Sequence, residues 1–230
     1  MRSVIKCLVV ASLVASSGVY ADNMYVSVSG GIGKIPAITS SRDFPLLNKS
    51  PGLTPTDINS VKLFFKNSKN IGGAIGYQFG DTRTELAINT FKADYKKFVQ
   101  DAIYYFPADY LSGKLAVNSF FLNGYYDFDS SKTLTPYVGA GIGMAKVKNT
   151  LYHSGLHNYI NGVWTALPTF KADMSQTMPV YQLIAGAKIN ITRQLALTAD
   201  YRFFSTIGTM KALNNRLTNH AFNVGMMFGF

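Results

Sequence analysis

Eight segments of this chain alternate apolar residues with small or polar ones at a period of two, which is the repeat of an extended strand with one apolar face. In the last segment, Phe222 and Val224 fall on one face and Asn223 falls on the other. Each segment is about as long as the 9–11 residues that a tilted strand needs to cross a bilayer. The segments are 24–32, 71–79, 83–91, 115–128, 135–145, 180–189, 195–203 and 219–230. Phe121 breaks the alternation of the fourth segment, which indicates either a bulge or a large core residue there.

The connections between these segments alternate strictly between short and long. The short ones are 80–82, 129–134 and 190–194, and the long ones are 33–70, 92–114, 146–179 and 204–218. A soluble β-sandwich has no reason for this alternation, whereas outer-membrane barrels have tight turns at one end and long loops at the other. We therefore predict an all-β fold, a transmembrane eight-stranded antiparallel up-and-down β-barrel. Its termini are expected in the periplasm and its four long loops outside the cell.

The apolar residues are dispersed through these short segments. Hydrophobic residues make up 47% of the chain and charged residues only 15%, which is low for a soluble protein of 230 residues. Beyond the N-terminus there is no run of about 18 apolar residues, so the sequence excludes a helical membrane span there. A barrel accounts for both facts, because only every second residue of its strands faces lipid.

The N-terminus has the features of a secretion signal. Arg2 and Lys6 precede an apolar stretch at 7–19, and Val19-Tyr20-Ala21 fits the small-x-small cleavage pattern. We predict a cleaved signal peptide at 1–21 and a barrel domain at 22–230. The single cysteine, Cys7, leaves with the signal peptide, so no disulfide, thiolate metal site or cofactor is expected.

Five charged residues lie on the polar faces of the predicted strands: Arg83, Glu85, Lys188, Asp200 and Arg202. A basic residue that faces lipid costs about 2–4 kcal/mol at the bilayer midplane, so we expect these side chains inside the barrel. An eight-stranded barrel is just wide enough for side chains to fill it. The residues form either an ion gate or, as we favour, a structural core of salt bridges.

Most of the positive charge falls in the long connections. The chain has 22 Lys and Arg residues against 12 Asp and Glu, a net charge of +10, and about two thirds of the basic residues lie in these loops. The predicted secretion signal argues against nucleic acid as their partner. Lipopolysaccharide phosphates or sulfated host glycans are suitable anionic partners, and a solvated loop surface explains the charge equally well. Aromatic residues in the loops either anchor a protein partner or pack the loops together. The candidate loop contacts are Lys62, Lys66, Lys69, Lys96, Lys97, Tyr104, Tyr105 and Trp164.

Local signals give some detail at the two ends of the barrel. Asn161-Gly162 lies between two short apolar pairs and predicts a hairpin with a type I′ turn in the third loop. The prolines of the first loop predict an irregular segment there. Aromatic residues near the short connections predict a girdle at the membrane interface. They are Tyr77, Phe79, Tyr126, Phe128, Tyr137 and Phe230.

The C-terminal segment carries the most specific pattern. An aromatic residue ends the chain and apolar residues precede it at every second position: Phe222, Val224, Met226, Phe228 and Phe230. This spacing resembles the signal that the barrel-assembly machinery reads in outer-membrane proteins. An extended strand with one apolar face can be added to an open sheet edge by β-augmentation, which explains such recognition physically.

Three strand motifs carry a resemblance to a known superfamily. They are Tyr25-Val26-Ser27-Val28-Ser29-Gly30-Gly31, Thr135-Pro136-Tyr137-Val138-Gly139-Ala140-Gly141-Ile142-Gly143 and Leu195-Ala196-Leu197-Thr198-Ala199-Asp200-Tyr201-Arg202. They resemble the strands of eight-stranded outer-membrane barrels of the OmpA-like and opacity-protein type, which include bacterial surface antigens. The resemblance covers the strands and the terminal Phe, and it implies a fold and a membrane without specifying a ligand.

From the residues and the resemblance together we expect a non-enzymatic protein of the bacterial outer membrane whose loops mediate adhesion or host and surface contact. The alternatives are a small pore and, third, an outer-membrane lipid hydrolase. A hydrolase needs an oriented histidine. His153 and His157 flank Ser154 without an acid beside them, and His220 has only Asn219 and Thr218 as neighbours in sequence. We therefore name no catalytic and no metal-binding residue.

Overall fold

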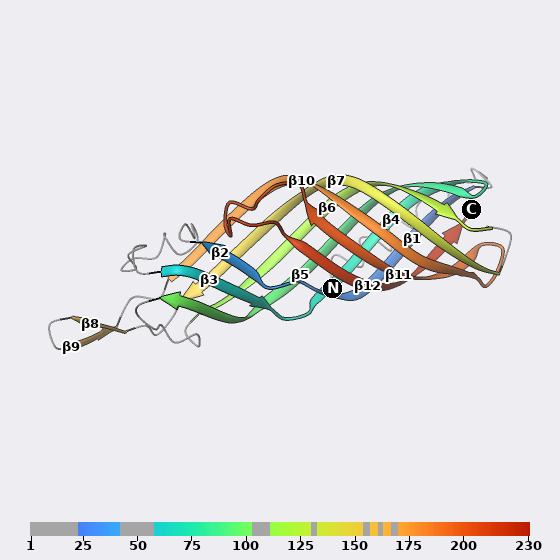
Figure 1. Cartoon of the computed structure of the whole chain (residues 1–230). Coiled ribbons are helices and arrows are strands. Elements are labelled where there is room, and N and C mark those ends of the chain that lie inside the picture. The colour runs from blue at the N-terminus through green and yellow to red at the C-terminus, as the bar shows by residue number, and fades with distance from the viewer. Residues whose placement is uncertain are drawn as a thin grey trace.

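The computed structural model describes residues 23–41, 58–102, 111–129, 133–153, 157–160, 163–166 and 170–230. Within these ranges the ordered elements are β-strands (Figure 1). None of the described residues belongs to a helix long and apolar enough to cross a membrane.

Eight of the strands close into an antiparallel barrel, which confirms the predicted fold class. In chain order they are β1 (Met24–Lys34), β4 (Ser68–Phe79), β5 (Thr82–Ala102), β6 (Leu111–Asp127), β7 (Leu134–His153), β10 (Phe170–Asn190), β11 (Leu195–Thr206) and β12 (Thr218–Gly229). Each strand pairs with its neighbours in this series, and β12 pairs with β1 to close it. Each predicted segment overlaps one of these strands, because the alternation marks their membrane-facing stretch.

The two faces of the wall differ as the period of two requires. Outward positions carry exposed apolar side chains, and Phe222 and Val224 are each 69% exposed. Inward positions are filled, and Phe121 is fully buried. The pairing of β6 with β5 and β7 runs through Phe121 without a register shift. Of the two explanations for the broken alternation, the large core residue is therefore the one observed.

Short connections gather at one end of the barrel, which we call the turn end. Gly80 and Asp81 join β4 to β5, and Gly80 has a φ of +58°, a left-handed conformation that glycine adopts without strain. The start of β1 and the end of β12 lie here too, since Tyr25 is the pairing partner of Gly229. We call the opposite end the loop end (Figure 1).

At the loop end the strands continue well into the segments predicted as external loops, 33–70, 92–114, 146–179 and 204–218. The strand β5 runs to Ala102 and β10 begins at Phe170. The irregular segment predicted in the first loop rests on Pro45, Pro51 and Pro55, which lie outside the described residues. On either side of them β2 (Ile38–Ser41) pairs with β3 (Ile58–Phe65), and β3 pairs with β5. Lys92, Asp94 and Lys96 are exposed on the extension of β5, and polar outward residues end the apolar alternation without ending the strand.

The third long connection contains the predicted hairpin. The strands β8 (His157–Ile160) and β9 (Val163–Ala166) are paired, with Ile160 opposite Val163 across Asn161-Gly162. This agrees with the preference of Asn-Gly for tight hairpin turns.

Candidate functional site: the barrel interior and the loop end

The turn-end half of the interior holds a buried ion triad of Arg83, Asp127 and Lys188. The side chain of Asp127 is completely buried. Its Oδ1 accepts from Nε of Arg83 at 2.9 Å, and its Oδ2 accepts from Nζ of Lys188 at 2.9 Å. Nε2 of Gln78 also donates to Oδ2, at 3.1 Å. Buried charges are tolerated when each has partners of this kind.

Arg83 and Lys188 were expected inside the barrel from the sequence, whereas Asp127 was not. The residue is the last of β6 and continues the inward series of Asn123 and Tyr125 by two positions, a signal that was present in the sequence. The pairing also differs from what proximity in sequence suggests. Arg83 pairs with Asp127 on the neighbouring strand β6 and not with Glu85 on its own strand.

Glu85 is held by neutral donors. Its carboxylate accepts from the hydroxyls of Tyr25 at 3.2 Å and Tyr125 at 3.1 Å, and from Nδ2 of Asn123 at 3.1 Å. The guanidinium of Arg83 lies over the Tyr125 ring, 4.5 Å from its centroid. The tyrosine rings therefore connect the buried carboxylate to the buried cation.

Asp200 and Arg202 form the third buried group. Nε and Nη2 of Arg202 donate to the two carboxylate oxygens of Asp200 at 2.8 and 3.1 Å. Tyr137 donates its hydroxyl to Asp200 at 3.1 Å while its ring lies 4.9 Å from the Arg83 guanidinium. Tyr137 is thus buried inside the barrel, and its assignment to the interfacial girdle is wrong. It occupies the inward register of β7, as Thr135 does.

The five charged positions named from the sequence thus lie in one interior network, joined by Asp127 and three tyrosines. Such a network fixes the packing of the polar half of the barrel. Bidentate pairing and neutral hydrogen bonds leave its charges compensated within the described residues, which is the arrangement expected of a structural core.

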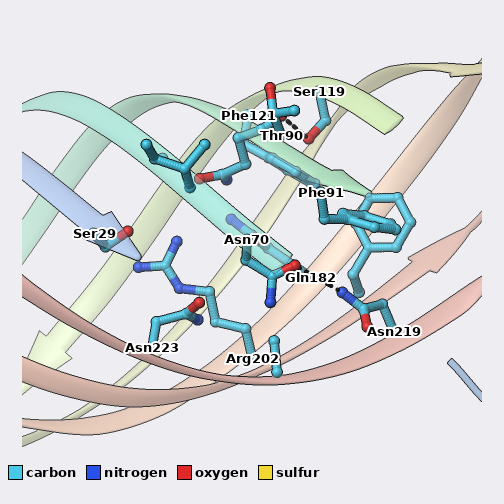
Figure 2. A pocket seen from close by; sticks show the side chains of 15 residues that line it. Ser29, Asn70, Thr90, Phe91, Ser119, Phe121, Gln182, Arg202, Asn219 and Asn223 are labelled. Atoms are coloured by element: carbon cyan, nitrogen blue, oxygen red, sulfur yellow. Dashed lines mark hydrogen bonds between the residues drawn. The ribbon is translucent and has the colours of Figure 1, made fainter. Parts of the chain in front are cut away.

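A small polar cavity lies between this network and the loop end. Its volume is about 40 Å³, room for very few water molecules. Asn70, Arg202 and Asn223 line it, and Nδ2 of Asn70 is buried there without a hydrogen-bond partner (Figure 2). Phe91 and Phe121 also line it (Figure 2).

Between the cavity and the loop end, the interior of the barrel is apolar and filled. Phe204 packs edge-to-face on Phe91, with ring centroids 5.1 Å apart, and on Phe121, at 6.1 Å. The segment 207–217 contributes further buried apolar side chains at the mouth. Four of them, namely Met210, Ala212, Leu213 and Leu217, are buried. The fourth connection therefore buries these four apolar residues at the mouth of the barrel, while Ile207 is exposed.

The candidate loop contacts lie at the loop end, where the structure describes them. The side chains of Lys62, Lys66, Lys69, Lys96 and Lys97 are exposed. Lys97 pairs across strands with Phe64, and Nζ of Lys62 lies 5.5 Å from the centroid of the Phe64 ring. Tyr104 and Tyr105 fall outside the described residues. Trp164 lies in β9, but its side chain is outside the described part of the structure.

A second ionic group lies on the outer surface of the loop end. Asp173 accepts from the Thr150 hydroxyl at 2.6 Å and from Nζ of Lys171 at 3.0 Å, and Lys148 lies 3.9 Å away. The hydrogen bond from Thr150, followed by the one from Lys171, holds the pKa of Asp173 below its ordinary value.

The apolar residues of the C-terminal pattern face outward on β12. Phe222, Val224, Met226 and Phe228 are exposed on the barrel wall, and Phe230 donates its backbone N–H to the carbonyl of Met24. The strand pairs with β1 on one side and β11 on the other.

The described residues offer little that resembles a catalytic centre. Nδ1 of His220 lies 2.6 Å from the Tyr201 hydroxyl on the outer wall, beside the Phe203 and Phe222 rings. Ser154 lies outside the described residues, as do the side chains of His153 and His157. No group of three metal-ligating side chains occurs within the described ranges.

A closed barrel with an apolar outer belt and a buried polar network in its filled interior defines a transmembrane β-barrel. The family described as outer membrane protein beta-barrel domain matches residues 6–230, and this chain belongs to that family. The protein is therefore a β-barrel of the bacterial outer membrane.

Individual relatives are more distant. The outer membrane protein PagN of Salmonella typhimurium is 31% identical over 144 residues, which cover 58% of this chain and 56% of PagN. The Rickettsia conorii protein RC1281, whose name proposes it as an adhesin, is 24% identical over 164 residues, covering 68% of this chain and 63% of that protein. The chain thus spans little more than half the length of PagN. Among solved structures, Neisserial surface protein A is 19% identical with a TM-score of 0.49, covering 90% of this chain and 97% of that one.

Proposed function

We propose that this protein is a non-enzymatic surface adhesin whose loop end contacts sulfated glycans on host cells. The observation that carries the proposal is the contrast between the two parts of the barrel. The interior is filled by side chains, whereas the loop-end strands extend past the apolar outer belt and carry exposed lysines. A protein built in this way acts through its outer surface.

The projecting sheet is long enough to reach past the membrane surface. From Lys92 to Ala102 the strand β5 continues for eleven residues, and their ten steps span about 33 Å along the strand. The partner strand β3 brings Lys62 beside it, next to Phe64. Cations spaced along an extended sheet match the regular negative charge of a sulfated polysaccharide, and aromatic surface beside them adds contact area.

The proposal includes an orientation and an assembly route. The turn end and both termini lie in the periplasm and the loop end lies outside, because tight turns are periplasmic in barrels of this kind. Before the barrel closes, the assembly machinery adds β12 to an edge of its own sheet. It recognises the strand by its outward apolar side chains. The name of RC1281 supports an adhesive role, and the positive charge of the loop end supports binding to sulfated glycans.

Neither alternative function has a specific observation in its favour. A pore needs a continuous wet passage, and within the described residues Phe91, Phe121 and Phe204 block the interior above a cavity of about 40 Å³. A hydrolase needs an acid that orients a histidine, and His220 contacts Tyr201 instead.

The test uses a non-adherent bacterium that displays the full chain and cultured cells with or without sulfated glycans. We expect binding to the sulfated cells and loss of most of that binding with Lys62→Gln/Lys97→Gln. The matched control is Lys211→Gln, an exposed lysine of the segment 207–217, which should bind as the wild type does. Equal binding to desulfated cells, or by the double variant, would refute the proposal.

A further inference from the structure

The outer wall of the barrel carries an apolar groove that no part of the adhesive surface uses. It has a volume of about 510 Å³ and crosses β5, β6, β7 and β10. Gly124 and Ala140, neighbours across β6 and β7, form part of its lining, together with larger side chains that include Leu122, Ile142 and Leu183. A Cβ atom added to Gly124 would meet nothing within 4 Å, so the groove is open to the lipid.

A cluster of lysines lies on the same wall towards the loop end. On β7, Lys146 follows Ile142 by four residues on the outward face, and Lys148 follows by six. The cross-strand row through Lys148 runs to Ala116 on β6 and to Lys92 on β5. The wall between the groove and the lysines is also apolar. There Phe120 on β6 is the cross-strand partner of Met144 on β7, and both side chains are exposed.

The lysines outnumber the carboxylates beside them, although Asp94 is exposed on the same face of β5 two residues after Lys92. Lys69 and Lys92 are direct cross-strand partners, and like charges in such pairs are destabilising. Within the described residues Lys69, Lys92 and Lys146 make no ion pair. Lys148 lies 3.9 Å from Asp173, which already pairs with Lys171 at 3.0 Å. A bound anion would relieve the repulsion.

The distance from the groove to the lysines matches the distance from the acyl chains of a membrane lipid to its phosphate. Four residues of a strand span about 13 Å and six about 20 Å, and strand tilt shortens the height of both. One leaflet of the hydrocarbon core is about 15 Å thick. An acyl chain in the groove therefore places its phosphate at the height of Lys146 and Lys148. Lys92 lies two strand spacings from Lys148, about 10 Å, which suits a headgroup with a second phosphate.

We propose that this wall binds a diphosphorylated glycolipid of the outer leaflet, with its phosphates on Lys92, Lys146 and Lys148 and an acyl chain in the groove beside Gly124. The proposal rests on the proposed orientation, in which the loop end faces outwards. It uses none of the lysines assigned to adhesion.

The test measures dissociation constants of fluorescent diphosphoryl lipid A and of phosphatidylglycerol for the full chain refolded in detergent micelles. We expect Lys146→Gln/Lys148→Gln to weaken lipid A binding at least tenfold, and Gly124→Leu to weaken it about fivefold by filling the groove. Lys146→Arg/Lys148→Arg keeps the charge and should bind within twofold of the wild type. The matched control Lys34→Gln removes an exposed lysine of β1, on another part of the wall, and should change binding less than twofold.

The outcomes separate the possibilities. Unchanged binding by the double Gln variant overturns the proposal, and so does an equal loss with Lys34→Gln, which indicates diffuse charge attraction. Phosphatidylglycerol bound as tightly as lipid A overturns the assignment of a diphosphorylated headgroup. Heat-modifiable migration on a gel verifies that each variant is folded. The cell-binding assay with Lys146→Gln/Lys148→Gln should be unchanged, so failure of the lipid site is distinguishable from failure of the adhesive function.

Discussion

Asp127 is the residue whose replacement should perturb the barrel most for the smallest change in shape. Asp127→Asn keeps the side-chain volume and removes the only negative charge within 4 Å of Arg83 and Lys188 among the described residues. Removing one partner of a buried ion pair costs about 3–5 kcal/mol. Arg83 cannot release its proton, so in the variant its charge stays buried without a partner.

We therefore expect Asp127→Asn to lower the free energy of unfolding by about 5 kcal/mol, because one carboxylate compensates two buried cations. The assay is reversible urea unfolding of the barrel in lipid vesicles, followed by tryptophan fluorescence and gel mobility. Part of the loss should return in Asp127→Asn/Lys188→Met, where one cation is removed together with its partner.

The control for this prediction is built into the chain. Asp173 also contacts two lysines, Lys148 and Lys171, but its side chain is 37% exposed. Exposed ion pairs contribute about 0–1 kcal/mol, so Asp173→Asn should lower stability by less than about 1 kcal/mol. If both substitutions had the same small effect, the argument that burial makes the Asp127 triad structurally essential would be wrong.

Three further predictions concern other parts of the molecule. Deleting Phe230 should reduce the amount of heat-modifiable protein in outer membranes, because the aromatic residue that follows β12 is lost; normal insertion would contradict the assembly signal. Phe121→Ala should cost about 3–5 kcal/mol in the same urea assay, since its ring is fully buried against Phe204; a loss below about 1 kcal/mol would show that the interior is loosely packed. The carboxyl carbon of Asp173, followed by NMR, should titrate below the ordinary Asp range, and Thr150→Val should move its pKa upward. Because the pKa of Asp173 is lowered in the folded protein, this carboxylate stabilises the fold at pH values above the ordinary Asp pKa. The stabilisation is lost as the pH falls through the lowered value. An unchanged pKa in the variant would exclude the Thr150 hydrogen bond as the cause.

The sequence alone determined the barrel and its wall. A period of two is a property of each strand by itself, so the outward face of β12 could be assigned without knowing its neighbours. The cost of exposing charge to lipid was enough to predict that Arg83 and Lys188 lie inside. The Asn161-Gly162 hairpin was equally local, because its turn type depends on two residues.

The tertiary structure decided which of these residues meet. Asp127 is 44 residues from Arg83 and 61 from Lys188, and only the closure of β5 against β6, together with the width of the barrel, brings the three side chains into contact. The burial of apolar residues from 207–217 at the barrel mouth and the lysine rows across β5, β6 and β7 likewise depend on strand register. Register follows from long-range pairing along the whole barrel, and a single strand contains the period of its pattern but not the position of its partner.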